Sequence, residues 1–406
     1  MNYKNNAAKA AKEKLLTKNF LLISIVNFLL FFGFEMLATV VSLYIAYIGG
    51  DSRAVGLSMG IFTLTALIIR AVTGILLDRM GRKKVFFAGL VTMVVITYVY
   101  GLIPSVGLIL GVRFLHGIGW GISSTSSNTV ASDNIPRSRF GEGMGWFGLS
   151  NSLGMAVGPA TGLTILNFSG YRNMFTFSAA TAFLCLVLAL FISYPALTES
   201  GKEAVGESTC DAESDIGKPV KKGSAIEKGA VLPAVTIMCI SVTYGALVSF
   251  LALFAQEKGI SNIGSYFTVY AAAMLLTRPA AGRLTDKKGT AFVVVPAIIL
   301  CTAGMVVLGL SQVIWHFLIS AVLYGMGMGS AMSSLQTMAV TSAPAERTGS
   351  ANATFMIGFD GGIGIGSMTA GLLVAAVGYG SMFLCLSGCV LFSGLIFAVF
   401  SPKKKR

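Results

Sequence analysis

Charged residues are scarce in this chain: only 12% of its 406 residues are Asp, Glu, Lys or Arg, which is about half the usual share. Hydrophobic residues make up 54%, and the mean hydropathy is +0.77. Apolar runs of about 20 residues or more recur along most of the length, each long enough to cross a hydrocarbon core of about 30 Å. This composition excludes an ordinary soluble protein and indicates a polytopic membrane protein.

Several chemical motifs are also missing. The sequence has no GxxxxGK[ST] phosphate loop, no metal-ligand spacing and no nucleophile with an evident base. Five of the six cysteines lie in apolar runs, where a small hydrophobic residue is expected. We therefore expect no enzymatic activity, no cofactor, no disulfide and no metal site. The 48 glycines lie within apolar runs without period-two alternation, which favours closely packed helices over a β-barrel.

The positive charge lies mostly on one side of the predicted topology. The net charge is +13, and 24 of the 30 Lys and Arg residues fall in segments that we place in the cytosol. The excess is therefore a topological signal, and it does not indicate a nucleic-acid partner. The first apolar run is about 29 residues long and lacks a cleavage pattern, so we expect it to remain as the first span. Both termini are predicted to be cytosolic, in a multi-pass protein of the inner or plasma membrane.

The chain contains an internal repeat. Arg70, Gly74, Asp78 and Gly81 recur as Arg, Gly, Asp and Gly 208 residues further on, and 24 of the 93 positions from 70 to 162 are identical at this offset. The repeat continues without a gap. We infer two copies of one six-helix module.

The predicted organisation follows from the repeat and the apolar runs. Twelve spans in two pseudo-symmetric six-helix bundles give an all-α membrane fold. Residues 196–229 are polar, hold seven of the 17 acidic residues and cannot bury enough apolar surface to fold alone. The predicted segments are a cytosolic N-terminus (1–18), a first bundle (19–195), a cytosolic linker (196–229), a second bundle (230–400) and a basic cytosolic tail (401–406).

Glycine spacing marks a helix contact in the fifth span. Gly154, Gly158 and Gly162 are four residues apart and share one helix face, so another helix can approach closely there. Pro159 removes one backbone donor and permits a bend. Packing alone is a sufficient explanation of this pattern.

Four stretches resemble signatures of the major facilitator superfamily, and the resemblance covers nearly the whole chain. The loop from Gly74 to Lys84 is similar to the signature between spans 2 and 3, and the stretch from Gly282 to Gly289 to its copy in the second half. The stretch from Ile109 to Gly119 resembles motif B, with a histidine where glutamine is usual. The stretch from Gly145 to Gly162 resembles motif C, which is associated with proton-coupled export, although leucine follows where a second glycine is common.

The resemblance implies a central cavity that opens alternately to the two sides of the membrane. It also implies that Asp78 helps to latch the halves on the cytosolic side, at a helix N-terminus and a nearby arginine. The conformational residues that it assigns are Gly74, Asp78, Gly81, Arg82, Gly282 and Asp286. The antiporter-motif residues are Gly145, Gly154, Gly158, Pro159 and Gly162.

Polar residues that break the repeat are candidates for function. At the offset of 208, Glu35 pairs with Thr243 and Asp360 with Ser152, while Arg113 and His116 pair with Ala321 and Tyr324. An ionisable side chain at mid-membrane costs about 2.5–3.5 kcal/mol on insertion scales and normally faces a cavity or a partner. We predict a proton- and substrate-binding centre of Glu35, Arg113, His116, Trp120 and Asp360. Structural hydrogen bonds are the alternative for Glu35 and Asp360, and packing is the alternative for His116.

The preferred function is proton-coupled efflux of a small organic compound, a drug-like cation for example, by alternating access. The alternatives are proton-coupled transport of a defined metabolite (a sugar, carboxylate or osmolyte) and a non-transporting sensor or lipid-handling protein on the same scaffold. The expected partners are protons, a small-molecule substrate and the lipid bilayer, and the protein is expected to be a monomer.

Overall fold

The computed structural model describes residues 15–136, 139–194, 227–260, 262–344 and 348–400, apart from the side chains of 71, 78, 140–142, 286, 348 and 349. The predicted N-terminus, linker and tail (1–18, 196–229 and 401–406) lie largely or wholly outside these residues. The described chain is helical, with no strand in those ranges. Its elements are α2 (Lys18–Tyr47), α3 (Ser52–Met80), α4 (Arg82–Val99), η1 (Tyr100–Leu102), α5 (Val106–Asp133), α6 (Phe140–Leu190), η3 (Lys228–Ala230), α8 (Val231–Glu257), α9 (Gly264–Lys288), α10 (Thr290–Gly309), α11 (Ile314–Thr341) and α12 (Thr348–Phe400).

Two of these helices contain a break. In α6 and α12 the backbone leaves the helical region at Gly170 (φ 77°, ψ 175°) and at Gly378 (φ 78°, ψ 172°), so each consists of two helical segments joined at a glycine. Only glycine adopts this conformation at little cost. Within the described residues, nine helices are long and apolar enough to cross a membrane. The all-helical membrane fold is confirmed, and the number of twelve spans stays a prediction.

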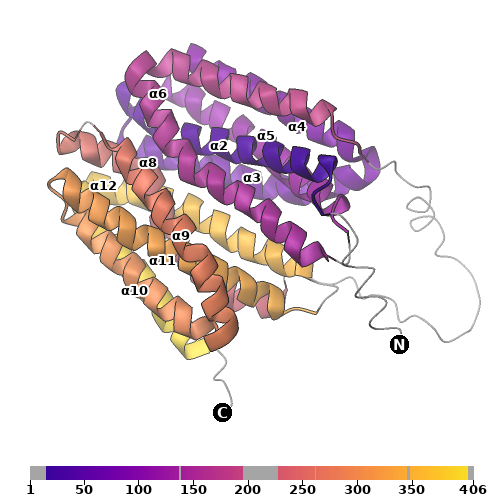
Figure 1. Ribbon diagram of the computed structural model, residues 1–406. Coiled ribbons are helices and arrows are strands. Elements are labelled where there is room, and N and C mark those ends of the chain that lie inside the picture. The colour runs from indigo at the N-terminus through magenta and orange to yellow at the C-terminus, as the bar shows by residue number, and fades with distance from the viewer. Residues whose placement is uncertain (1–14, 137–138, 195–226, 261, 345–347, 401–406) are drawn as a thin grey trace, which may run out of the picture.

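The helices form two lobes, one from α2 to α6 and the other from α8 to α12 (Figure 1). The repeat extends to the packing between helices. In the first lobe Gly117 and Gly121 approach the carbonyls of Phe62 and Ala66, and 208 residues later Gly325 and Gly329 approach those of Tyr270 and Met274. At these glycines a side chain would collide with backbone atoms of the facing helix, at 2.5–2.9 Å. The glycine face therefore sets how closely α5 packs on α3, and α11 on α9.

The first helix of each lobe follows a different offset. Gly154 and Gly158 of α6 face the carbonyls of Phe28 and Phe32, whereas Gly362 and Gly366 of α12 face those of Met238 and Val242. These carbonyls are 210 residues apart, so α2 and α8 correspond at an offset of 210. The counterpart of Glu35 is therefore Gly245, and the pairing of Glu35 with Thr243 was wrong. Glu35 still has no polar counterpart.

The lobes are in close contact toward one end of the molecule. We call the end with the Gly49, Gly170, Gly259 and Gly378 turns distal, and the end that carries the Gly81 and Gly289 turns proximal; α2 begins and α12 ends on the proximal side (Figure 1). Distally, Ser52 of α3 donates a hydrogen bond to the carbonyl of Gly371 in α12, at 3.1 Å.

The contact between α3 and α12 ends before the proximal end. A side chain added at Gly56 would meet the Ser367 carbonyl of the other lobe at 2.4 Å, whereas one added at Gly74, further along the same helix, would meet no atom within 4 Å. The same holds at Gly145 and Gly148 of α6. Among these glycines, the close backbone contact between the lobes is therefore made at the distal one, Gly56.

Candidate functional site

Glu35 lies at the contact between the lobes. It is 3% exposed, and its Oε2 accepts a hydrogen bond of 3.2 Å from the hydroxyl of Tyr244 in α8. On its own lobe, the backbone of α2 is held against α6, because Gly158 leaves only 2.7 Å between its notional Cβ and the Cβ of Glu35. A carboxyl group removed from water in this way favours its neutral, protonated form. A buried carboxyl group thus lies where the two lobes meet.

Asp360 has an ion-pair partner that the sequence interpretation did not include. The Arg70 guanidinium of α3 donates to Asp360 Oδ2 of α12, across the lobes, and the two side chains are 24% and 25% exposed. A second guanidinium nitrogen of Arg70 lies 3.5 Å from the Ser124 hydroxyl. Asp360 is close enough to Glu35 for electrostatic repulsion between the two carboxylates. The two predicted acids therefore belong to one region of the interface.

The ion pair has a symmetry-related counterpart without a carboxylate. Arg278 of α9 corresponds to Arg70, and Ser152 of α6 corresponds to Asp360, each at the offset of 208. Arg278 Nη1 donates to the Ser152 hydroxyl, again across the lobes. Its Nε is buried and has no hydrogen-bond partner. The interface thus holds two equivalent arginines, of which one is neutralised and the other is not.

Aromatic rings of the second lobe lie behind these charged groups. Tyr244 stacks with Phe359 and with Tyr270 at 6.2 Å between ring centroids, and Tyr270 stacks with Tyr324 at 6.0 Å. The Tyr324 hydroxyl lies 2.8 Å from that of Thr243, whereas the buried Tyr270 hydroxyl has no partner. These four rings form a continuous ladder from α12 through α8 and α9 to α11, which we call the tyrosine ladder.

Arg113, His116 and Trp120 lie elsewhere, inside the first lobe. Arg113 is fully buried, and its three guanidinium nitrogens have no hydrogen-bond partner; it lies over the rings of Phe62 and Tyr100, at 5.6 and 5.7 Å. His116 Nδ1 is 3.2 Å from the Tyr100 hydroxyl. The structure therefore divides the five predicted residues between the lobe interface and this separate cluster.

Trp120 extends the cluster toward α2. Its ring stacks on Phe34 at 4.4 Å and meets Phe31 edge-on at 4.9 Å. Phe34 directly precedes Glu35 in α2, so adjacent residues of this helix contact the cluster and the lobe interface.

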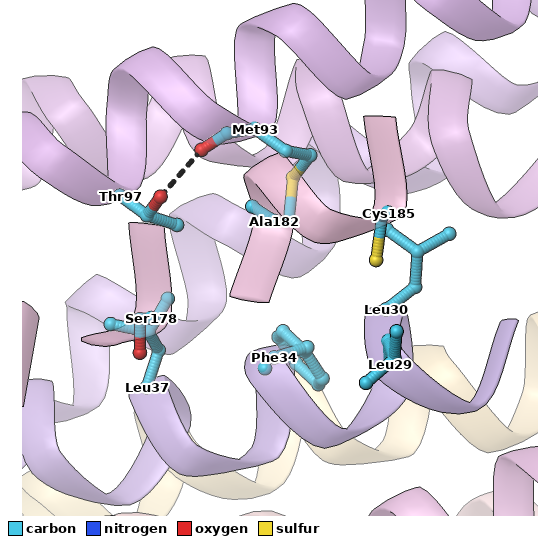
Figure 2. A pocket seen from close by; sticks show the side chains of 10 residues that line it. Leu29, Leu30, Phe34, Leu37, Met93, Thr97, Ser178, Ala182 and Cys185 are labelled. Carbon is cyan, nitrogen blue, oxygen red and sulfur yellow. Dashed lines mark hydrogen bonds between the residues drawn. The ribbon is translucent and has the colours of Figure 1, made fainter. Parts of the chain in front are cut away.

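A small hollow also lies within the first lobe, between α2, α4 and the second segment of α6 (Figure 2). Its walls are mostly apolar, and the hydroxyl of Thr97 is satisfied by the carbonyl of Met93 at 2.8 Å. The lining does not include Glu35, Arg113 or Asp360. This hollow is therefore distinct from the predicted central site.

The antiporter-motif glycines fall into two groups. Gly154, Gly158 and Gly162 contact α2, where a side chain would meet backbone atoms at 2.8–3.0 Å, and Pro159 lies inside α6 between them. Gly145 has no atom within 4 Å of its notional Cβ. The first three thus set the α2–α6 distance.

The predicted conformational residues lie at the proximal ends of α3 and α9. Gly81 and its repeat Gly289 have φ values of 88° and 92°, and each ends one helix and begins the next. Arg82 Nε donates to Asp133 at 3.1 Å. Gly282 faces only the Ser333 hydroxyl at 3.8 Å. The side chains of Asp78 and Asp286 lie outside the described residues, so their latch role stays a prediction.

The sequence matches the profile of the Major Facilitator Superfamily over residues 23–353, with a second match over 260–406. It is 25% identical, over 374 residues, to an uncharacterised MFS-type transporter of Methanocaldococcus jannaschii, covering 91% of this chain and 94% of that protein. It is also 25% identical, over 382 residues, to the multidrug resistance protein MdtG of Salmonella typhi, covering 89% of this chain and 90% of that protein.

Solved structures share the fold. A bacterial homologue of the human lysosomal transporter Spinster, in an inward-facing and unoccupied conformation, gives a TM-score of 0.76 at 14% identity and covers 94% of this chain and 95% of its own. The nucleoside transporter NupG gives a TM-score of 0.72 at 12% identity, over 95% of this chain and 100% of its own. At these identities the likeness concerns the fold alone.

Proposed function

Since the chain belongs to the major facilitator superfamily, we propose that it is a secondary active transporter that expels a small organic compound in exchange for protons. The family members that it matches are transporters and not enzymes, and their substrates are small molecules. Efflux, proton coupling and an orientation with cytosolic termini in the cell membrane are our proposals. The multidrug relatives at 25% identity support the first of them.

The observation that carries the proposal is the position of Glu35. Its carboxyl group is buried in the contact between the lobes and bonded to Tyr244 of the opposite lobe. When the lobes move apart, this bond breaks and water reaches the carboxyl group, which then favours ionisation. Proton loading is thereby tied to the movement of the lobes.

Asp360 supplies the second carboxylate. Its pairing with Arg70 also joins the two lobes, so the same movement exposes the pair to water and weakens it. Competition between the substrate and a proton for Glu35 then gives exchange, because the two cannot occupy the carboxylate together. In the predicted topology the distal contact between the lobes corresponds to closure on the outer side of the membrane.

The test is transport by purified protein in liposomes loaded with a pH-sensitive dye. A proton gradient is imposed, and compounds are added from a panel of organic cations, zwitterions and anions. We expect at least one compound to drive proton movement that Glu35→Gln and Asp360→Asn reduce, while both variants keep a normal elution profile on size exclusion. Parental coupling in both variants would refute the roles of these acids.

A further inference from the structure

Two side chains of opposite charge flank the tyrosine ladder, and neither has an ion-pair partner among the described residues. Glu35 is bonded to the Tyr244 hydroxyl at 3.2 Å, and Arg278 lies within electrostatic reach of Tyr270. The rings of Tyr244 and Tyr270 are 6.2 Å apart and nearly parallel, at 26°. A negative group from the first lobe and a positive group from the second therefore both lie near this pair of stacked rings.

The polar atoms on the positive side are unsatisfied. Arg278 Nε and the Tyr270 hydroxyl are buried without a hydrogen-bond partner. A buried donor without an acceptor is costly, and a guanidinium is best satisfied by a carboxylate or phosphate that accepts two parallel bonds. Ser152 accepts one bond and carries no charge. This side of the ladder therefore lacks an anion.

The other lobe shows that a carboxylate can occupy the position that faces this arginine. At the equivalent position of the other lobe, Asp360 neutralises Arg70. Serine at position 152 leaves Arg278 with its charge available. The surrounding charges are accounted for, because Asp360 is paired with Arg70 and Glu35 is bonded to Tyr244.

We propose that the lobe interface binds a zwitterionic compound with an aromatic or apolar body, whose anionic group is held by Arg278 and whose cationic group is held by Glu35. The inference rests on the proposed transport function and adds the class of substrate. The tyrosine rings are at most 1% exposed in this arrangement, so the compound enters when the lobes part. Its cationic group competes with a proton for Glu35, which is consistent with exchange.

Three matched fluorescent probes test the charges separately. Nε-dansyl-lysine carries an ammonium and a carboxylate, dansylcadaverine is the same molecule without the carboxylate, and dansyl-aminohexanoate is the same molecule without the ammonium. Binding to the full-length protein in detergent is measured by dansyl fluorescence. A charge-assisted hydrogen bond to a buried group predicts that the parent binds dansyl-lysine about tenfold or more tightly than either analogue.

The variants assign each charge to its residue. Arg278→Gln should bind dansyl-lysine only as tightly as dansylcadaverine, and its affinity for dansylcadaverine should stay within about twofold of the parent. Ser152→Asp keeps the arginine but gives it an internal carboxylate, and it should lose the same preference. Arg283→Gln, which removes an exposed arginine from the same helix, is the control and should bind all three probes as the parent does.

Equal affinity of the parent for all three probes, no binding of any probe, or an unchanged preference in both Arg278→Gln and Ser152→Asp would overturn the site. This result is separable from transport. A parent that shows the predicted preference but moves no protons in liposomes refutes the proposed coupling alone. One that exchanges protons for another compound without the preference refutes the site alone.

Discussion

Gly56 offers a direct test of how the lobes close. A methyl group at this position would lie 2.4 Å from the Ser367 carbonyl oxygen and 3.2 Å from the Gly371 Cα, all across the interface. Both neighbours are backbone atoms in a helix and cannot move aside alone. Overpacking of this kind costs about 1–3 kcal/mol.

The cost of Gly56→Ala applies only while the lobes touch distally. If a second arrangement separates them there, the substitution shifts the equilibrium toward it by about 5- to 150-fold, since about 1.4 kcal/mol corresponds to a factor of ten. Gly74→Ala is the matched control on the same helix. Its methyl group meets no atom within 4 Å, so it costs nothing in the described arrangement.

The assay is a distance measurement between spin labels at Arg53 and Ala376, two exposed positions at the distal ends of α3 and α12, in a cysteine-free background. Gly56→Ala should raise the population at longer distances about 5- to 150-fold relative to that at the shorter distances. Gly74→Ala should leave it unchanged or narrow it. An unchanged distribution in Gly56→Ala, with the protein still folded, would refute the described distal contact or the existence of a second arrangement.

Three further predictions follow from packing and charge. Gly158→Ala should destabilise the protein by about 1–3 kcal/mol, because its methyl group would lie 2.8 Å from the Phe32 carbonyl oxygen. Gly145→Ala, whose methyl group meets no atom within 4 Å, should not destabilise it, and thermal unfolding in detergent compares the two variants. Arg113→Met should keep or raise thermal stability, because it replaces a buried cation without an ion-pair partner by an apolar chain; a fall of more than about 2 kcal/mol would mean that its ring contacts outweigh the burial cost. Asp360→Asn should destabilise the folded protein more than the double variant with Arg70→Gln, because the single change leaves the guanidinium unpaired; equal losses would show that the unpaired guanidinium carries no extra cost.

The arrangement of the helices in two similar lobes was largely predictable, because many of the positions that match between the two halves are glycines at turns and helix contacts. Gly170 and Gly378 share one non-helical conformation at the predicted offset, as do Gly81 and Gly289. The shift of α2 against α8 was missed, because the window of identities began after the first helix. The apolar runs also predict separate spans over 140–167 and 173–195, and α6 is interrupted between them at Gly170.

The candidate site was only partly predictable. Mid-membrane acids stand out in an apolar sequence, so Glu35 and Asp360 could be named. Their partners could not, because Arg70 and Tyr244 come from other helices that only the packing of the lobes brings close. One signal was available in the repeat. Arg70 matches Arg278, and Asp360 matches Ser152, so a contact between Arg70 and Asp360 implies an equivalent contact between Arg278 and Ser152.

The most direct test of proton coupling is proton release on ligand binding. Purified protein in weakly buffered detergent near neutral pH is titrated with the compound that the liposome screen identifies, and the pH change is recorded. The account predicts that the parent releases about one proton per bound ligand and that Glu35→Gln, at saturating ligand, releases far fewer. Equal release by both proteins, or none by the parent, would contradict it.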